Sequence, residues 1–202
     1  MLKRTMLAVA LTLGAALTAH ADPYVFDKAH SYVGFTIRHM TISRVNGAFN
    51  DYDGQIDYDP KEMSKSSVEI TIKTASVDTR NSGRDDDLKR DGFFFVDSFP
   101  TITFKSTKVT PKDSTKFEIT GDLTIRGITK PVTLQAEKLG QITDPRGGTK
   151  LGFTATTTIN RLDFGVGNSS ALPGGGLMLG RDVDISLEVE AGTPRPPENK
   201  TN

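Results

Sequence analysis

The feature that most constrains the fold of this chain is a period of two in its apolar residues. In the clearest row, Val183, Ile185, Leu187, Val189 and Ala191 alternate with charged or hydroxyl residues. Successive side chains of a β-strand point to opposite faces, so this pattern is typical of a strand with one buried face. The same period recurs at residues 33–37, 49–58, 68–72, 102–104, 117–125, 132–136 and 151–159. The sequence therefore predicts about eight strands and an all-β protein.

Helical periods are scarce. The best candidate is Ser82 to Asp91, with Ser82 as the N-cap, acidic residues in the first turn and basic residues in the last. A second short turn is expected at residues 60–64. Because so few helices are available to cover the apolar strand faces, the sheet must cover itself, as two stacked sheets or as a closed antiparallel barrel.

Strand length favours the barrel. Residues 116–126 form an eleven-residue strand candidate, which would be about 36 Å long at ~3.3 Å per residue. Long strands in a meander suit a tall barrel better than a sandwich. An eight-stranded barrel either packs solid or holds one small ligand, and the sequence leaves both possibilities open.

The N-terminus has the pattern of a secretory signal. Lys3 and Arg4 precede an apolar run at residues 6–17, and Ala19-His20-Ala21 follows as a cleavage site. The run is shorter than the ~20 residues that span a bilayer, so we expect an exported chain that does not span the membrane. The predicted organisation is a signal peptide at 1–21, one domain at 22–192 and a disordered tail at 193–202, which has almost nothing apolar to bury.

Composition excludes several functions. Basic and acidic side chains balance at 25 each, which lacks the basic excess of a nucleic-acid binder. The absence of cysteine excludes disulfides, thiol catalysis and cysteine-ligated metals. We expect no nucleic-acid partner, and the sequence leaves a homodimer open.

Catalytic and metal-binding patterns are thin. His30 and His39 flank one strand candidate without a metal-ligand spacing, and the acidic runs at 50–54 and 85–87 fit a strand end and a helix N-terminus. The glycine clusters at 165–167 and 174–176 lack the remaining residues of a nucleotide loop. We therefore predict no catalytic residue, no metal site and no enzyme. The alternative is an enzyme that uses His30 or His39 as acid or base, for which no orienting carboxylate stands at a local spacing.

The inward-facing rows predict a dry apolar interior whose natural guest is a lipid. A tail of about 20 carbons gains ~6 kcal/mol at ~0.3 kcal/mol per heavy atom. The three consecutive phenylalanines at 93–95 cannot all enter one core, so this segment is expected to cap or line the cavity. A further alternative is an interaction or stress protein whose barrel is filled by its own side chains. The residues predicted to contact the lipid tail are Phe35, Ile37, Ile70, Ile72, Phe104, Phe117, Leu123 and Phe153, with Phe93 and Phe94 closing one side and Arg38 and His39 at the head group.

Several motifs, in order along the chain, carry a family resemblance. They include Phe26-Asp27-x-x-His30-Ser31, Phe99-Pro100-x-Ile102-x-Phe104 and the stretch Gly121-Asp122-Leu123-Thr124 to Pro131-Val132. With Arg84-Asp85-x-x-Leu88 and Asp144-Pro145-x-Gly147-Gly148, they resemble the successive motifs of the YceI-like family over essentially the whole chain after the signal.

The resemblance implies a lipocalin-like, eight-stranded antiparallel barrel with one or two short helices, periplasmic or secreted. It implies a carrier that holds a polyisoprenoid, a quinone-like lipid or a similar long-chain amphiphile, and no other cofactor. Asp87 and Arg146 depart from the family pattern, which commonly has histidine at the first position and often an aromatic residue at the second. If either position touches a head group, ligand specificity differs here.

Overall fold

The protein is a closed antiparallel β-barrel. The computed structural model describes residues 23–145, 147–168 and 170–193, so the predicted signal peptide and all but Thr193 of the predicted tail lie outside the described residues. The strands are β1 (Tyr24–Phe26), β2 (Tyr32–His39), β3 (Ser43–Phe49), β4 (Tyr52–Asp57), β5 (Ser67–Lys73), β6 (Val77–Asp78), β7 (Thr101–Pro111), β8 (Lys116–Ile125), β9 (Ile128–Thr143), β10 (Thr149–Asn160) and β11 (Leu179–Gly192). Among the described residues, four short helices accompany them, α1 (Ser82–Lys89) and the 3-10 helices η1 (Met63–Lys65), η2 (Thr74–Ser76) and η3 (Arg161–Phe164).

These eleven strands occupy eight positions around the barrel. Strands β1 and β2 both pair with β11, while β1 pairs with β4 and β2 pairs with β3. In turn β4 pairs with β5 and β3 with β6. Three of the eight positions are therefore strands interrupted near their middle, β1 with β2, β3 with β4, and β5 with β6. Contacts of β1 with β11 and β4 close the ring, and the predicted eight-stranded antiparallel barrel is confirmed.

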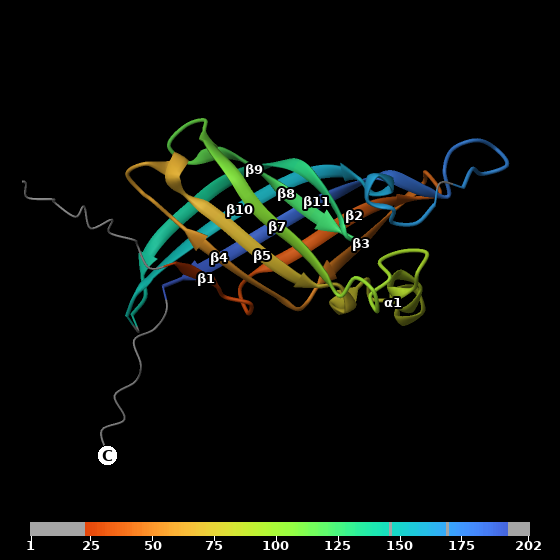
Figure 1. Ribbon diagram of the computed structural model, residues 1–202, viewed down its shortest axis with the longest axis horizontal. Helices are drawn as coiled ribbons and strands as arrows, with labels where there is room; N and C mark the ends of the chain where they lie inside the picture. Colours follow the sequence, from red (N-terminus) through yellow and green to blue (C-terminus); the bar gives the residue numbers. More distant parts are fainter. Residues whose placement is uncertain (1–22, 146, 169, 194–202) are drawn as a thin grey trace, which may run out of the picture.

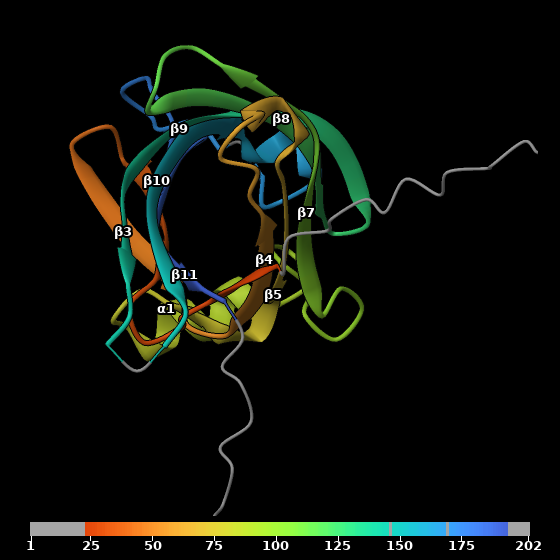
Figure 2. The same cartoon turned by 90° about the vertical axis from the view of Figure 1, so that its left-hand side faces the viewer.

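The barrel lies lengthwise in Figure 1, and Figure 2 looks along it through the ring of strands. One end carries the β2–β3 turn, α1 and the segment 165–178, and we call this end the mouth. At the opposite end, aromatic rings pack edge to face across the interior, with Tyr58 against Tyr24 and Phe153, and Phe153 against Phe117. Rings in such T-shaped contacts contribute stability beyond their buried area.

The helix differs from its predicted start. The N-cap is Asn81 and not Ser82, because the Asn81 side chain accepts a hydrogen bond from the Arg84 backbone N–H at 3.0 Å. Both residue types cap well, so the sequence pattern alone could not separate them. The helix also ends at Lys89, and the turn expected at residues 60–64 corresponds to the 3-10 helix η1, which begins three residues later and ends one residue later. In the described part of the chain, no helix is long and apolar enough to cross a membrane.

Candidate ligand-binding cavity

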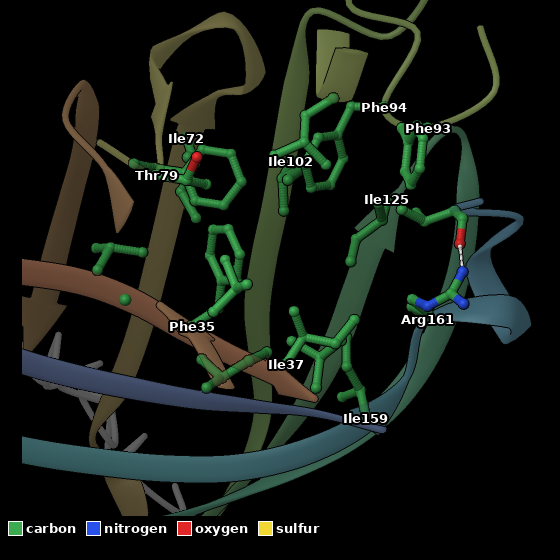
Figure 3. A pocket seen from close by; sticks show the side chains of 18 of the residues that line it. Phe35, Ile37, Ile72, Thr79, Phe93, Phe94, Ile102, Ile125, Ile159 and Arg161 are labelled. Atoms are coloured by element: carbon green, nitrogen blue, oxygen red, sulfur yellow. Dashed lines mark hydrogen bonds between the residues drawn. The ribbon is translucent and has the colours of Figure 1, made fainter. Parts of the chain in front are cut away.

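The mouth half of the barrel encloses an apolar cavity of about 550 Å³, which is within the range of small-molecule sites. Its wall consists of inward-facing side chains from the barrel strands, and Figure 3 shows Phe35, Ile37 and Ile159 turned toward the same space. The apolar lining from the strands is Val33, Phe35, Ile37, Val45, Phe49, Ile70, Ile72, Ile102, Phe104, Leu123, Ile125, Val132, Leu134, Ile159, Leu179, Val183, Ile185 and Leu187. A barrel filled by its own side chains, one alternative left by the sequence, does not agree with this space.

A second, smaller chamber of about 80 Å³ lies toward the opposite end. The two spaces share five lining residues, which form a waist between them: Val33, Ile70, Phe104, Leu134 and Leu187. The aromatic residues Tyr58, Phe117 and Phe153 line the smaller chamber. A chain-like ligand seated in the main cavity therefore meets these five side chains where the two spaces adjoin.

The predicted contact residues divide among three places. Those that line the main cavity are Phe35, Ile37, His39, Ile70, Ile72, Phe93, Phe94, Phe104 and Leu123. Phe117 and Phe153 line the smaller chamber. Arg38 lines neither space and is exposed, because it neighbours Ile37 and His39 on β2 and points to the other face of the strand.

The segment after α1 carries Phe93 and Phe94 into the cavity wall (Figure 3). The Phe94 ring packs against Phe49 with 5.6 Å between centroids. Phe95 points elsewhere, packing against Phe99 on the outside of this segment. This division fits the expectation that three consecutive phenylalanines cannot share one core.

Arg126 holds this segment in place. It lies in the turn between β8 and β9 with a φ of 51°, unusual for a residue other than glycine. From there its guanidinium donates hydrogen bonds to the backbone carbonyls of Asp91 and Phe93. It also lies over the rings of Phe95 and Phe99, 6.0 and 5.8 Å from their centroids. Cation–π contacts at these distances add to the hydrogen bonds.

Helix α1 is anchored to β6 through Thr79, which is 5% exposed. The carboxylate of Asp85 accepts hydrogen bonds from the Thr79 backbone N–H and hydroxyl, at 2.8 and 2.6 Å. Arg84 donates back to the Thr79 hydroxyl and carbonyl, at 2.7 and 2.8 Å. All three polar groups of Thr79 thus have partners, as buried polar groups require.

Arg161 is a buried cation beside the cavity, 4% exposed, at the point where β10 ends. Its guanidinium donates to the backbone carbonyls of Gly180 at 2.7 Å, Val166 at 2.6 Å, Asn168 at 2.7 Å and Leu179 at 3.3 Å. Figure 3 shows the guanidinium of Arg161 at the edge of the cavity with one of its hydrogen bonds. Within the described ranges no carboxylate pairs with it, so it stands as a positive charge stabilised by carbonyl dipoles. Burial lowers the pKa of Arg161 from its ordinary value, but an arginine remains protonated at neutral pH.

Polar groups collect at the mouth. The polar side chains there that line the cavity are His39, Thr79, Arg84, Asp87, Arg161, Asn168 and Ser170. Asp87, one of the departures from the family pattern, is among them, whereas Arg146 lies outside the described residues. A ligand with an apolar tail and a polar head therefore fits with its head at this end.

His30 lies at the opposite end of the barrel and lines neither space. Its Nδ1 lies 3.0 Å from the carboxylate of Asp27, three residues earlier, so the expectation that no carboxylate stands near it in sequence is wrong. Glu190 joins the same cluster, and all three ligand atoms lie within 4.8 Å of one another. Lys150 occupies the cluster as well, with an ion pair to Asp27 at 3.3 Å and a shorter one to Glu190. The cluster ties β1, β10 and β11 together.

Replacement of Asp27 by asparagine tests this tie through pH. Burial alone raises the pKa of Asp27, but hydrogen bonds from His30 and Lys150 outweigh it and hold the pKa below its ordinary value. A carboxylate with a lowered pKa stabilises the fold above the unfolded pKa of about 3.9 and loses this contribution as the pH falls through the folded value. We expect Asp27→Asn to lower the melting temperature by about 2–4 °C at pH 7, or roughly 1 kcal/mol.

The difference between Asp27→Asn and the wild type should shrink as the pH falls below about 4. Asp97→Asn is the control, since Asp97 is exposed and has neither hydrogen bond nor ion pair in the described part of the chain. Calorimetry at several pH values measures both variants. An Asp27→Asn deficit that is constant from pH 7 to the acid limit would contradict the assignment.

Sequence reasoning missed most of the mouth. Val166, Asn168, Ser170 and Met178 line the cavity from the segment between β10 and β11, where no alternating row exists to indicate which way a side chain points. A signal for Arg161 was present, because a lone cation follows the apolar row of β10 at Asn160-Arg161. A charge at the inner end of such a row indicates a buried polar contact.

A closed antiparallel barrel with an apolar interior open at one end is the architecture of lipocalin-like binding proteins. The sequence model of the YceI-like domain family matches residues 24–191 of this chain. The chain belongs to the YceI-like family, and the resemblance noted in the sequence is confirmed.

Relatives agree with this assignment. A UPF0312 protein of Pseudomonas paraeruginosa is 43% identical over 172 residues, which cover 82% of this chain and 88% of the relative. The crystal structure of a Campylobacter jejuni YCEI protein superposes with a TM-score of 0.68 at 38% identity, covering 84% of this chain and 96% of that one. A polyisoprenoid binding domain from Saccharophagus degradans has a TM-score of 0.60 at 15% identity over 85% of this chain and 98% of that one. At that identity, the last comparison shows the fold alone.

Proposed function

We propose that this protein is an exported carrier that holds a long-chain isoprenoid-type lipid, with the tail inside the barrel and the head group at the mouth. The observation that carries the proposal is the apolar cavity of about 550 Å³, whose charged and polar lining groups lie at the mouth and whose wall otherwise carries one hydroxyl, that of Thr157. At ~30 Å³ per heavy atom, the density of a liquid, this space takes roughly 18 heavy atoms. That number is close to the tail of about 20 carbons for which ~0.3 kcal/mol per heavy atom gives a gain of ~6 kcal/mol.

Two further observations support the proposal. The domain from Saccharophagus degradans with the same fold is described as binding a polyisoprenoid. The pattern of residues 1–21 is that of a secretory signal, which supports a periplasmic location. A carrier there would sequester or move a lipid that water dissolves poorly.

The enzymatic alternative has less support. An acid–base pair must reach one substrate together, yet His39 lies at the mouth and His30 at the opposite end of the barrel, outside both spaces. The His39 ring has no hydrogen-bond partner in the described ranges that would orient it. We therefore propose binding without chemical turnover.

Native mass spectrometry of the protein purified from its own periplasm tests the carrier function. We expect a species heavier than the bare chain by the mass of one long-chain lipid, released by organic extraction. The delipidated protein should take up an isoprenoid quinone added in its place. A chain that carries no lipid on purification and takes up no isoprenoid quinone would sink the proposal.

A further inference from the structure

Of the four exposed large apolar side chains that the described residues place at the mouth, Ile128 at the start of β9 is 40% exposed, and the other three lie on the β2–β3 turn and at the end of the segment 165–178. Ile42 at the β2–β3 turn is 86% exposed, Met178 is 47% exposed and Met40 is 39% exposed. We call these three residues the rim. Met40 and Met178 are tied by a hydrogen bond from the Met40 N–H to the Met178 carbonyl at 2.8 Å. This bond joins two segments far apart in the sequence at the rim.

The backbone of the rim adopts a conformation that costs conformational energy. Met40 and Thr41 have φ values of 51° and 65°, in the left-handed region that residues other than glycine rarely adopt. Such strain persists only where the surroundings fix it, and it collects at functional segments. Here it places the most exposed apolar side chain of the described residues at the tip of a hairpin, with an apolar cavity directly behind it.

Arginines without partners surround the rim. Arg38 and Arg44 lie directly opposite each other on β2 and β3, and Arg181 stands at the start of β11. All three are exposed, and none has a hydrogen bond or ion pair from its side chain in the part of the chain that the structure describes. Like charges placed opposite each other on a sheet repel, so this pair favours an external anion.

Acidic side chains near the mouth do not neutralise these arginines. On α1, Asp86 pairs with Lys89 and Asp87 with Arg90. On β11, Asp184 accepts a hydrogen bond from Thr158, and Asp182 is exposed without an ion pair within the described ranges. Asp182 and Asp184 keep their charges, so Arg38, Arg44 and Arg181 exceed them by one positive charge on the strands beside the rim.

We propose that the rim docks the mouth of the barrel on the surface of an anionic lipid bilayer. The rim side chains enter the interface, and Arg38, Arg44 and Arg181 contact lipid phosphates. The segment 170–178, which carries Met178 at its base, projects beyond the barrel at this end (Figure 1), so this end of the molecule can reach a flat surface before the barrel wall does. This inference rests on the proposed function, because a docked mouth lets a lipid pass between bilayer and cavity without crossing water.

The size of the surface favours a bilayer over a protein partner. Stable protein interfaces need about 800 Å² on each side, whereas the rim consists of three side chains on two narrow loops. Apolar tips next to basic residues are typical of segments that lie in a membrane interface. Each arginine near an anionic surface strengthens binding roughly fivefold.

Vesicle sedimentation tests the docking. The assay uses the chain from residue 22, the form that the predicted cleavage produces, with vesicles of phosphatidylcholine alone or mixed three to one with phosphatidylglycerol. We expect binding to the mixed vesicles that weakens in high salt. Ile42→Asp should weaken it by at least about tenfold, since it removes the most exposed apolar side chain of the rim and adds a negative charge. Arg38→Gln combined with Arg44→Gln should weaken it by about 25-fold.

Variants away from the mouth serve as controls. Leu139 is 63% exposed at the opposite end of the barrel, so Leu139→Asp should bind the mixed vesicles as the wild type does. Lys61→Gln combined with Lys108→Gln removes two exposed charges away from the mouth and should have little effect. Equal binding to neutral and anionic vesicles, or equal losses in rim and control variants, overturns the docking.

The docking and the carrier function can fail separately. A variant with a filled cavity, Ile185→Trp, should still sediment with the mixed vesicles. Rim-dependent sedimentation of a protein that holds no lipid would support docking and reject the carrier. Lipid uptake by a protein that does not sediment with anionic vesicles would support the carrier and reject the docking.

Discussion

Ile185→Trp is expected to weaken lipid binding about 20-fold. Ile185 faces the cavity from the middle of β11, and tryptophan adds roughly six heavy atoms to a space that takes roughly 18. A ligand that loses contacts for six atoms, at ~0.3 kcal/mol each, loses ~2 kcal/mol. Binding is measured by displacement of a fluorescent apolar probe from the delipidated protein. Because the barrel has space for the new side chain, the melting temperature should change little.

The neighbouring residue supplies a matched control. Ser186 lies on the outer face of the same strand and is exposed, so Ser186→Trp should bind lipid as the wild type does. The chain has no tryptophan of its own, and the emission of each introduced indole therefore reports one site. We expect blue-shifted emission from position 185 and water-like emission from position 186. Undiminished lipid binding by a variant with a blue-shifted indole at 185 would show that the ligand site lies elsewhere.

Arg161→Met is expected to produce the largest loss of stability. Arg161 donates to four backbone carbonyls around the 165–180 segment, and a buried carbonyl left without a donor costs about 1–3 kcal/mol. Allowing for relaxation and access of water, we expect a loss of about 4 kcal/mol. For a domain of this size, that loss lowers the melting temperature by roughly 8–16 °C. Thermal unfolding followed by circular dichroism measures it.

Two companions identify the cause. Arg161→Lys keeps the charge but lacks the planar guanidinium that reaches several carbonyls at once. Its melting temperature should therefore lie between that of the methionine variant and that of the wild type. Arg181→Met, at an exposed arginine, should shift the melting temperature by no more than about 2 °C. Hydrogen exchange should accelerate first in residues 165–180 of Arg161→Met. A methionine variant as stable as Arg181→Met would show that the four hydrogen bonds contribute little.

The alternation of apolar residues was enough to predict the barrel, because which face of a strand is buried is encoded locally. Val183 and Ile185 illustrate this, since each lies in an unbroken row and each lines the cavity. The interruptions of three strands could not be predicted in the same way. They depend on where chain segments such as 79–100 must leave the wall, which is a property of the closed ring and not of any one strand.

The candidate site shows the same boundary. Phe35, Ile37 and His39 share one parity along β2 and all three line the cavity, whereas Arg38, of the opposite parity, faces away. Outside the alternating rows, the sequence no longer indicates which way a side chain points. Asn168 and Met178 reach the cavity from an irregular segment, and their direction follows from the carbonyl contacts of Arg161 and from the hairpin contact of Met40, neither of which a local pattern contains.

The interruption between β5 and β7 makes the barrel wall unequal along its length. β5 pairs directly with β7 as far as Lys73 and Thr101, alongside the main cavity. Nearer the mouth, β6 pairs with β3 and with no other described strand. The wall there is completed by residues 79–100, whose base is fastened where the Thr74 N–H donates to the Pro100 carbonyl at 2.9 Å. A wall segment held by side-chain contacts moves outward more easily than strands joined by a ladder of backbone hydrogen bonds. We therefore expect the waist to limit the length of a bound lipid strictly. The wall formed by residues 79–100 should limit the width of the lipid less strictly.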